Sequence, residues 1–229
     1  MSLSHPHAAE AFGAAPRPPA APAEPRDPRA LSALPAWEPG DEPWEGLVVT
    51  GVDACGRDLA ELELSGARLE GCRLAGCLLE GASLSDVAFV ECDLSNAVLD
   101  QADLRRCSFT GCKLTGASFL EANLEDVTLD GCACGLCALT QARLWAVAAR
   151  ACDLSGADVS EASLRHVALD DVKLMGTSFF RTSLAGIDLR GCQLEGIVLS
   201  DAMDEVRGCT MDLIQAAGLA RRLGVVVEG

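Results

Sequence analysis

The sequence has few of the side chains that enzymes use for proton transfer or nucleophilic attack. It contains no tyrosine and only three histidines, and His166 is the one histidine beyond the first seven residues. No serine, histidine and acid combination is indicated, and neither a GxGxxG nor a P-loop motif occurs. We therefore expect a protein that is not an enzyme, with no cofactor, no catalytic residue and no metal ligand.

Positive charge and long apolar runs are also lacking. Lysine and arginine together number 18 against 34 acidic residues, which gives a net charge of −16 at pH 7. Because phosphate groups are bound by basic surfaces, this balance argues against nucleic acid or an anionic membrane as a direct ligand. The sequence has no apolar run long enough for a transmembrane helix and no basic-then-apolar signal pattern. We therefore expect a cytoplasmic protein, and the charge permits a protein partner with a basic surface.

What the sequence does have is a five-residue repeat that runs from Leu62 to Leu199 without insertion or deletion. Every fifth residue from Leu64 onward is apolar, most often leucine, and the residue two places earlier is always apolar or small. None of these positions carries a charge. A repeat of this regularity predicts a solenoid.

The spacing within the repeat also predicts the shape of the coil. Two inward residues separated by one outward residue form a very short strand, and the remaining two residues must turn the chain. Glycine often fills the second turn position, which suits a corner that needs positive φ. Like residues recur at intervals of twenty, as in the cysteines at 72, 92, 112, 132 and 152. Twenty residues per coil means four sides.

This pattern resembles the pentapeptide-repeat family, in which A(D/N)LXX units wind into a right-handed, four-sided β-helix. The resemblance is carried by stretches such as CDLSNAVLDQADLRR and ACDLSGADVSEASL, and it covers about residues 46–201. It implies an all-β solenoid, a right-handed quadrilateral β-helix of about seven to eight coils over residues 44–201. We expect residues 44–61 to form an imperfect first coil whose bulky residues cover the N-terminal end.

The two flanking segments have different compositions. Residues 1–43 are rich in proline and alanine and have no periodicity, so we predict a disordered tail. Residues 202–229 predict a capping helix with Thr210 as its N-cap, followed by a short strand at Val225–Val227. The expected apolar stripe of this helix is Leu213, Ala216, Ala217, Ala220 and Leu223. The resemblance to dimeric family members implies that this helix also joins two copies end to end.

The twelve cysteines fit the repeat rather than a disulfide framework. Nine occupy the small inward column and Cys134 occupies the leucine column, where a free thiol behaves as a small apolar group. Cys132, Cys134 and Cys137 have the spacing of a metal motif, but a zinc site usually needs a fourth ligand, which the neighbouring residues do not supply. We interpret these three residues as inward core positions.

Outward charge is concentrated on one side of the predicted coil. This acidic side is built on the inward column Leu79, Leu99, Phe119, Leu139, Val159, Phe179 and Leu199, and apolar residues also point outward beside its carboxylates. The candidate partner-binding residues are Glu80, Asp100, Leu120, Glu121, Asp158, Glu161 and Phe180. On another side Trp145 points outward, where it serves either as a partner contact or packs on Arg165 one coil above.

Two functions remain open from the sequence. The resemblance implies a protein that imitates duplex DNA and binds a type II topoisomerase, DNA gyrase or topoisomerase IV, giving resistance or self-protection. The chain departs from the loop-bearing members because no insertion interrupts residues 62–201. The alternative is an acidic scaffold or protein-interaction module that binds a partner unrelated to DNA enzymes.

Overall fold

The structure is a computed structural model and describes residues 38–228. The first 37 residues of the predicted disordered tail lie outside the described residues. Residues 38–43, which we assigned to the same tail, form a turn. In this turn the Asp41 N–H donates to the Glu38 carbonyl at 3.0 Å, and the Asp41 carboxylate accepts the Glu38 N–H at 2.9 Å.

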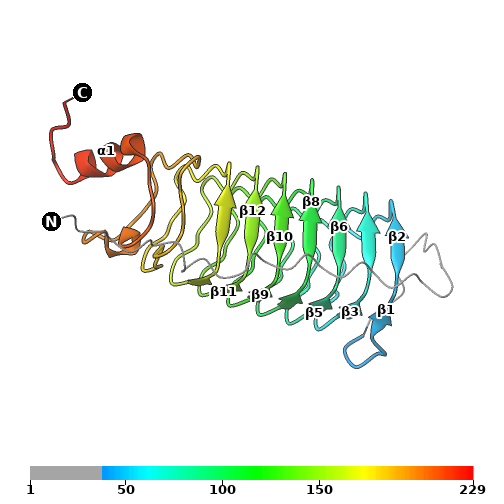
Figure 1. The fold of residues 1–229 in the computed structure, drawn as a ribbon. Coiled ribbons are helices and arrows are strands. Elements are labelled where there is room, and N and C mark those ends of the chain that lie inside the picture. Colours follow the sequence, from blue (N-terminus) through cyan, green and yellow to red (C-terminus); the bar gives the residue numbers. More distant parts are fainter. Residues whose placement is uncertain (1–37, 229) are drawn as a thin grey trace, which may run out of the picture.

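The middle of the chain is a parallel β-solenoid with two seven-stranded sheets on two of its four sides (Figure 1). One sheet contains β1 (Trp44–Glu45), β3 (Glu63–Ser65), β5 (Ser83–Ser85), β7 (Asp103–Arg105), β9 (Asn123–Glu125), β11 (Arg143–Trp145) and β13 (Ser163–Arg165). The other contains β2 (Val48–Thr50), β4 (Arg68–Glu70), β6 (Ala88–Val90), β8 (Ser108–Thr110), β10 (Thr128–Asp130), β12 (Ala148–Arg150) and β14 (Ala168–Asp170).

The register confirms the coil of twenty residues. Leu64 pairs with Leu84 in one sheet, and Phe89 pairs with Phe109 in the other. The two remaining sides are held by isolated parallel bridges at the same interval, up to Lys173 with Gln193 and Ser178 with Val198. Each pentapeptide is therefore one side and one corner of the coil, as the sequence predicts.

The number of strand-bearing turns is smaller than predicted. Seven stacked strands enclose about six turns, whereas we expected seven to eight coils. After β14 the chain keeps its four-sided path, but on two sides it pairs with the exit segment instead of continuing the sheets. The Leu184 N–H donates to the Glu205 carbonyl at 2.7 Å, and the Leu189 N–H donates to the Thr210 carbonyl at 2.8 Å.

The core is a continuous stack of the two inward columns. Leu94, Leu99 and Leu104 are fully buried. Phe89 and Phe109 lie on successive coils with their rings stacked, 4.8 Å between centroids and 2° between planes. Like residues stack because parallel strands bring the same column position into contact at the inter-strand spacing.

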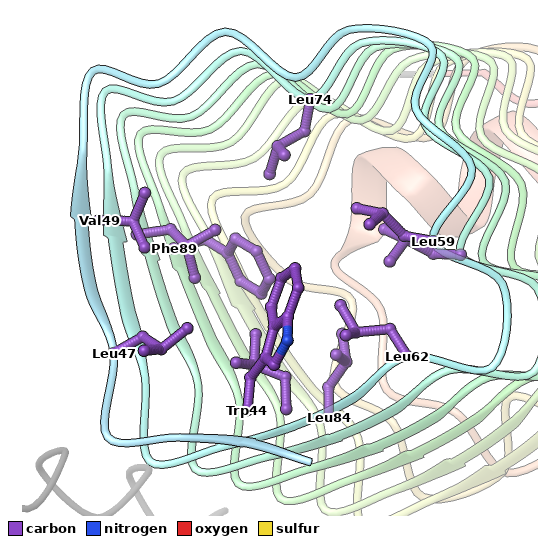
Figure 2. Close-up of a pocket in the computed structure, with 11 residues that line it drawn as sticks. Trp44, Leu47, Val49, Leu59, Leu62, Leu74, Leu84 and Phe89 are labelled. Carbon is purple, nitrogen blue, oxygen red and sulfur yellow. The ribbon is translucent and has the colours of Figure 1, made fainter. Parts of the chain in front are cut away.

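Trp44 closes the N-terminal end of this core. It lies in register with Leu64, as expected for the first coil. Figure 2 shows its indole reaching across the end of the coil toward Phe89, with Leu47 and Leu62 beside it. The enclosed space has a volume of about 20 Å³ and is lined by apolar side chains. The bulky residues of the first coil therefore cover the end of the core as predicted.

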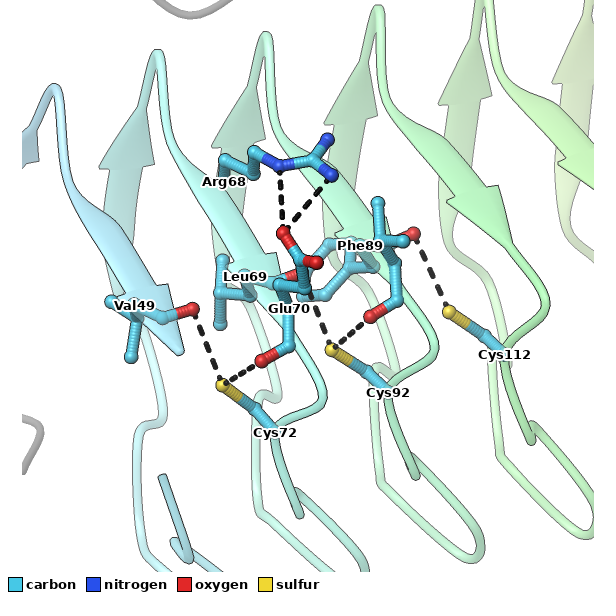
Figure 3. A network of polar contacts seen from close by, with 9 residues as sticks. Val49, Arg68, Leu69, Glu70, Cys72, Phe89, Cys92 and Cys112 are labelled. Atoms are coloured by element: carbon cyan, nitrogen blue, oxygen red, sulfur yellow. Dashed lines mark hydrogen bonds and ion pairs between the residues drawn. The ribbon is translucent and has the colours of Figure 1, made fainter. Parts of the chain in front are cut away.

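The buried thiols make a repeated contact with the coil below (Figure 3). The Cys72 Sγ donates to the Val49 carbonyl at 3.6 Å, and the Cys92 Sγ donates to the Leu69 carbonyl at 3.4 Å. The Thr177 hydroxyl makes the equivalent bond to the carbonyl 23 residues earlier, at 2.8 Å. The column therefore accommodates small side chains, and cysteine and threonine there also satisfy a carbonyl of the preceding coil.

All twelve cysteines are free thiols. Nine of the ten inward thiols occupy the small column, and Cys134 lies in the leucine column, as predicted from the sequence. Burial raises the pKa of the Cys107 thiol to about 12, so this thiol stays protonated and unreactive at neutral pH.

The corners adopt positive φ, which explains the glycines of the repeat. Gly116 has a φ of +71°, and a Cβ added there would lie 2.5 Å from the Asn96 Oδ1 of the coil below. Asn96 itself has a φ of 55°. The corners therefore favour glycine, and polar residues, mostly acids and amides, occupy many of the others.

The C-terminal end differs from the prediction in three respects. Helix α1 (Leu213–Arg222) begins at Asp212, whose carboxylate accepts the Gln215 N–H in a capping box, and not at Thr210. Thr210 still belongs to the solenoid because it pairs with Asp188. The expected apolar stripe is not buried, and Leu219 is the residue of α1 that packs on the core. No strand forms within residues 223–228 of the described chain.

A buried carboxylate fixes the exit from the solenoid. Glu205, in the short 3₁₀ helix η1 (Asp204–Val206), is 4% exposed. Its carboxylate accepts the N–H groups of Arg181 and Ser200, each at 3.0 Å, and the Ser200 hydroxyl at 2.9 Å. Burial would raise the pKa of Glu205, but these hydrogen bonds and one from its own N–H outweigh burial and lower it.

The buried leucine column gives a first prediction. We expect Leu104→Ala to lower the free energy of unfolding by about 2–5 kcal/mol, because the rigid stack cannot collapse into the cavity. Leu136→Ala is the control, since Leu136 is 68% exposed and its loss should cost less than about 0.5 kcal/mol. Urea denaturation followed by circular dichroism measures both. Equal costs for the two variants would contradict the buried stack.

Glu205 gives a second prediction. Glu205→Gln should lower the free energy of unfolding at pH 7 by about 1–3 kcal/mol, because the amide cannot accept all the hydrogen bonds of the carboxylate. Since the folded pKa is depressed, this contribution is present above the ordinary value of 4.5 and is lost as the pH falls through the folded pKa. The gap between the wild type and the variant should therefore narrow in acid. A gap that stays constant from neutral pH into strong acid would show that the ionised carboxylate is not responsible.

Candidate functional site

The acidic side predicted from the sequence exists as a continuous surface of the solenoid. Its outward residues stack through the bridges that join Leu78 to Val98, Asp158 to Ser178, and Ser178 to Val198. All seven candidate residues follow or flank these bridges, so the coil brings them onto one side. Their environments differ, however, and divide the carboxylates into two groups.

Among the seven candidate residues, Glu80 and Glu121 are the carboxylates with no side-chain partner in the described part of the chain. Both are exposed, and within the described chain neither forms an ion pair nor a side-chain hydrogen bond. Each carboxylate is therefore open to a partner. They are the members of the predicted set that best fit an electrostatic contact.

Asp100 and Asp158 are bound to their own surface. Asp100 accepts hydrogen bonds from the Ser118 hydroxyl and from the Leu120 N–H, the latter at 3.1 Å. Asp158 accepts the Ser160 N–H at 3.0 Å and the Thr140 hydroxyl at 3.2 Å. Partial burial would raise the pKa of Asp158, but the bonds from Ser160 and Thr140 outweigh it and lower the pKa. These two carboxylates hold neighbouring coils together as well as carrying charge.

Glu161 lies in a ladder of three corner residues. It accepts the Gln141 amide N–H at 3.0 Å and pairs with the Arg181 guanidinium at 3.3 Å. The hydrogen bonds from Gln141 and Arg181 lower the pKa of Glu161. The Arg181 guanidinium also lies 5.0 Å from the centroid of the Phe180 ring. In the C-terminal part of the acidic side, the carboxylate of Glu161 is therefore already paired with a cation of its own surface.

Apolar side chains lie exposed among these charges. Leu78, Phe180 and Val198 are exposed, whereas Leu120 is half-buried. Exposed apolar groups beside free carboxylates suit a contact with a protein surface.

The pairing of carboxylates across coils was not anticipated from the sequence. Acids and bases twenty residues apart face each other on successive coils, as in Asp53–Arg73 at 2.6 Å and Asp130–Arg150 at 2.6 Å. Asp86 and Arg106 form the same kind of pair, with two charge-assisted hydrogen bonds. An interval of twenty between opposite charges is the signal that could have revealed these pairs.

Trp145 is exposed as expected, but its ring contact differs from the prediction. The indole is 47% exposed and meets the His166 ring edge-on, with 5.0 Å between centroids and 73° between planes. Arg165 lies beside Trp145 on the next strand through backbone pairing. The side chain that packs against the Trp145 indole is therefore His166, the corner residue that follows Arg165.

Within residues 38–228, no group of three or more histidine, cysteine or acidic side chains is arranged to hold a metal ion. Over the same residues, no helix has the length and apolar composition required to cross a bilayer.

Comparisons with known proteins agree with the geometry. One family model, a pentapeptide repeat region, matches residues 82–149, and a second, pentapeptide repeats, matches residues 142–179. A comparison with curated protein sequences found no match. Two trypsin-treated variants of QnrB1, a plasmid-mediated fluoroquinolone resistance protein, are similar in structure, each at 21% sequence identity over 80% of this chain. The match covers 92% of one QnrB1 variant, with a TM-score of 0.54, and 90% of the other, with a TM-score of 0.50. At this identity the similarity concerns the fold alone.

Proposed function

Because the chain is a pentapeptide-repeat protein over residues 82–179, where the family models match it, we propose that it acts as a non-catalytic protein-binding rod. Its partner in this proposal is a bacterial type II topoisomerase, DNA gyrase or topoisomerase IV, in the cytoplasm. The protein occupies the basic surface on which that enzyme holds duplex DNA. Binding in this way gives resistance to a topoisomerase poison or protection against one that the cell makes itself.

The observation that carries this proposal is the amount of charge on a rod of this length. Seven stacked strands at about 4.8 Å span roughly 30 Å, and a DNA duplex of that length carries about 18 phosphate charges. Residues 44–170, which these strands span, contain 20 acidic and 9 basic side chains, a net charge of −11. The rod is therefore less charged than the duplex but of the same sign, and a basic groove that attracts a short duplex would attract it too.

The shape of the rod also supports the proposal. The coil runs from Trp44 to Leu199 with no inserted loop, so no loop keeps a partner away from the sides of the rod. Its fold is similar to that of QnrB1, a fluoroquinolone resistance protein. Because one fold can serve several functions, the similarity to QnrB1 is an analogy, and the proposal rests on the charge of the rod.

A scaffold role is the second candidate, and the apolar residues of the acidic side favour it. Leu78 and Val198 are exposed beside carboxylates, which is the composition of a general protein-contact surface. In that case the partner is unrelated to DNA enzymes, and the charge of the rod provides solubility.

Charge reversal at the two free carboxylates separates these functions. We expect the wild-type protein to inhibit supercoiling by purified gyrase at micromolar concentration, and the double variant Glu80→Lys with Glu121→Lys to inhibit at least tenfold more weakly. The control variant, Glu63→Lys with Glu91→Lys, changes the net charge equally on other parts of the rod. The wild-type inhibition should also weaken as salt is raised.

The outcomes of this assay are distinct. Absence of any effect of the wild-type protein on gyrase and topoisomerase IV would reject the DNA-mimic function and leave the scaffold role. Inhibition that survives in the double variant, or that falls equally in the control, would show that the acidic side is not the contact.

We also propose that two copies associate through the C-terminal end. Leu213 and Ile214 at the start of α1 are 88% and 84% exposed, and Leu223 and Val226 are exposed after it. Such a concentration of apolar side chains at one end of a rod suits burial against the same surface of a second copy.

Sedimentation equilibrium tests this association. We expect the wild-type protein to be a dimer, and the variant Leu213→Glu with Ile214→Glu to be a monomer with unchanged circular dichroism. The control, Leu136→Glu with Met175→Glu, places the same charges on exposed apolar residues of the solenoid outside α1 and should remain a dimer. A monomeric wild-type protein would contradict the proposal.

A further inference from the structure

The outer face of the sheet from β1 to β13 changes its charge along the rod. The outward residues are acidic on the first strands, mixed on β7 and β9, and basic on the last two strands. In order they include Glu45, Glu63, Asp103, Arg105, Glu125, Arg143 and Arg165. A basic region of this kind is unexpected on a protein with a net charge of −16.

The guanidinium groups of the last two strands are not neutralised. Arg105 pairs with Asp103 at 3.6 Å and with Glu125 at 3.9 Å. In contrast, no carboxylate within residues 38–228 lies at ion-pair distance from Arg143 or Arg165. Arg143 donates one hydrogen bond at 3.3 Å to the neutral side chain of Asn123. Both cations are exposed and retain donors for a ligand.

Trp145 lies between these two cations. It is two positions after Arg143 on the same outward face of β11, and it pairs with Arg165 across the ladder. Its indole is held edge-on by His166, so it is oriented and yet about half exposed. Since outward positions are about 6.7 Å apart along a strand and strands are about 4.8 Å apart, the two arginines project from points roughly 8 Å apart.

A surface hollow adjoins this group. Its volume is about 380 Å³, and Arg143 and Trp145 form one wall. Arg105 and Asp103 line the opposite side, and the residues of β9 lie between. The hollow exists because Asn123 and Leu124 lie lower than the long side chains on the neighbouring strands. It offers space beside the indole for one large side chain.

We propose that this basic and aromatic surface, formed by Arg143, Trp145, Arg165 and the adjoining hollow, binds an acidic peptide segment of a partner protein. The carboxylates of the segment pair with the two guanidiniums, and an apolar side chain beside them enters the hollow against the indole. This surface lies on the side of the solenoid next to the acidic side, and Glu121 lies at the corner that the two sides share. The inference rests on Arg143, Trp145 and Arg165, which take no part in the proposed topoisomerase contact.

The charges around the surface favour a short acidic peptide over nucleic acid. A nucleic acid strand places phosphates in a continuous series, and it would bring several of them against Asp103, Glu125 and Glu161. Two unpaired guanidiniums cannot offset that repulsion on a protein of net charge −16. A peptide with two or three carboxylates can match the two cations and leave the surrounding acids in solvent. An apolar peptide side chain also gains from burial against the indole, which adds specificity.

The experiment begins with an array of short synthetic peptides of varied composition, probed with the whole protein. The peptides that bind the wild type and not Trp145→Ala should be enriched in aspartate or glutamate next to a phenylalanine, tryptophan or leucine. Fluorescence anisotropy with the best such peptide, labelled, then gives the dissociation constants. Arg143→Gln and Arg165→Gln should each weaken binding by about tenfold.

The matched control is Lys113→Gln, which removes one positive charge from an exposed residue on another side of the rod, where no ion pair to Lys113 is formed among the described residues. It should change the dissociation constant less than twofold. The variant Glu80→Lys, three coils away from the coil of Arg143, should also leave peptide binding unchanged, which separates this surface from the proposed topoisomerase contact.

Three results would overturn the proposal. The first is that no peptide distinguishes the wild type from Trp145→Ala. The second is that Lys113→Gln weakens binding as much as Arg143→Gln, which would indicate a general charge effect. The third is that a single-stranded oligonucleotide binds more tightly than the acidic peptide and competes with it, which would assign the surface to nucleic acid.

Discussion

The structure depends on stacking each coil on an identical cross-section at the spacing between parallel strands. A side chain in an inward column contacts the residue twenty positions before it and the residue twenty positions after it. A column can therefore hold only side chains of similar size, as Phe89 on Phe109 and the succession of thiols show. The main-chain ladders and the bonds from Cys92 or Thr177 to the coil below satisfy the polar groups that this stacking buries.

The same interval organises the outer surface, and through it the proposed functions. Opposite charges twenty residues apart neutralise each other, as Asp130 and Arg150 do. The charged side chains without such a partner are the ones that can attract another molecule. Glu80 and Glu121 remain on one side, and Arg143 and Arg165 remain on another. A rigid rod can thus present an acidic contact surface and a small basic one without either disturbing the core, because outward positions are separate from inward ones.

The sequence predicts most of the solenoid because inward positions follow a strict rule that is visible without a structure. It predicts the ends less well, since these depend on tertiary contacts. Thr210 has the composition of an N-cap but pairs with Asp188, so α1 begins at Asp212. The seven candidate residues of the acidic side remain a prediction, and the division of its carboxylates into free and bound ones could not be read from the sequence, because it depends on neighbours such as the Ser118 hydroxyl. The hollow beside Trp145 results from the relative heights of side chains on three strands, which no single-strand pattern records.

The most direct measurement of the central claim is the removal of one complete coil. Deletion of residues 103–122 joins Ala102 to Asn123 and leaves every inward column in register. We predict that this variant folds, keeps the β-sheet circular dichroism of the parent and unfolds cooperatively in urea. Deletion of residues 103–120 shifts the register and places Glu125 in the small inward column, so it should not fold. A coil of twenty residues would be contradicted if both deletion variants folded equally well, or if only the variant that lacks residues 103–122 failed to fold.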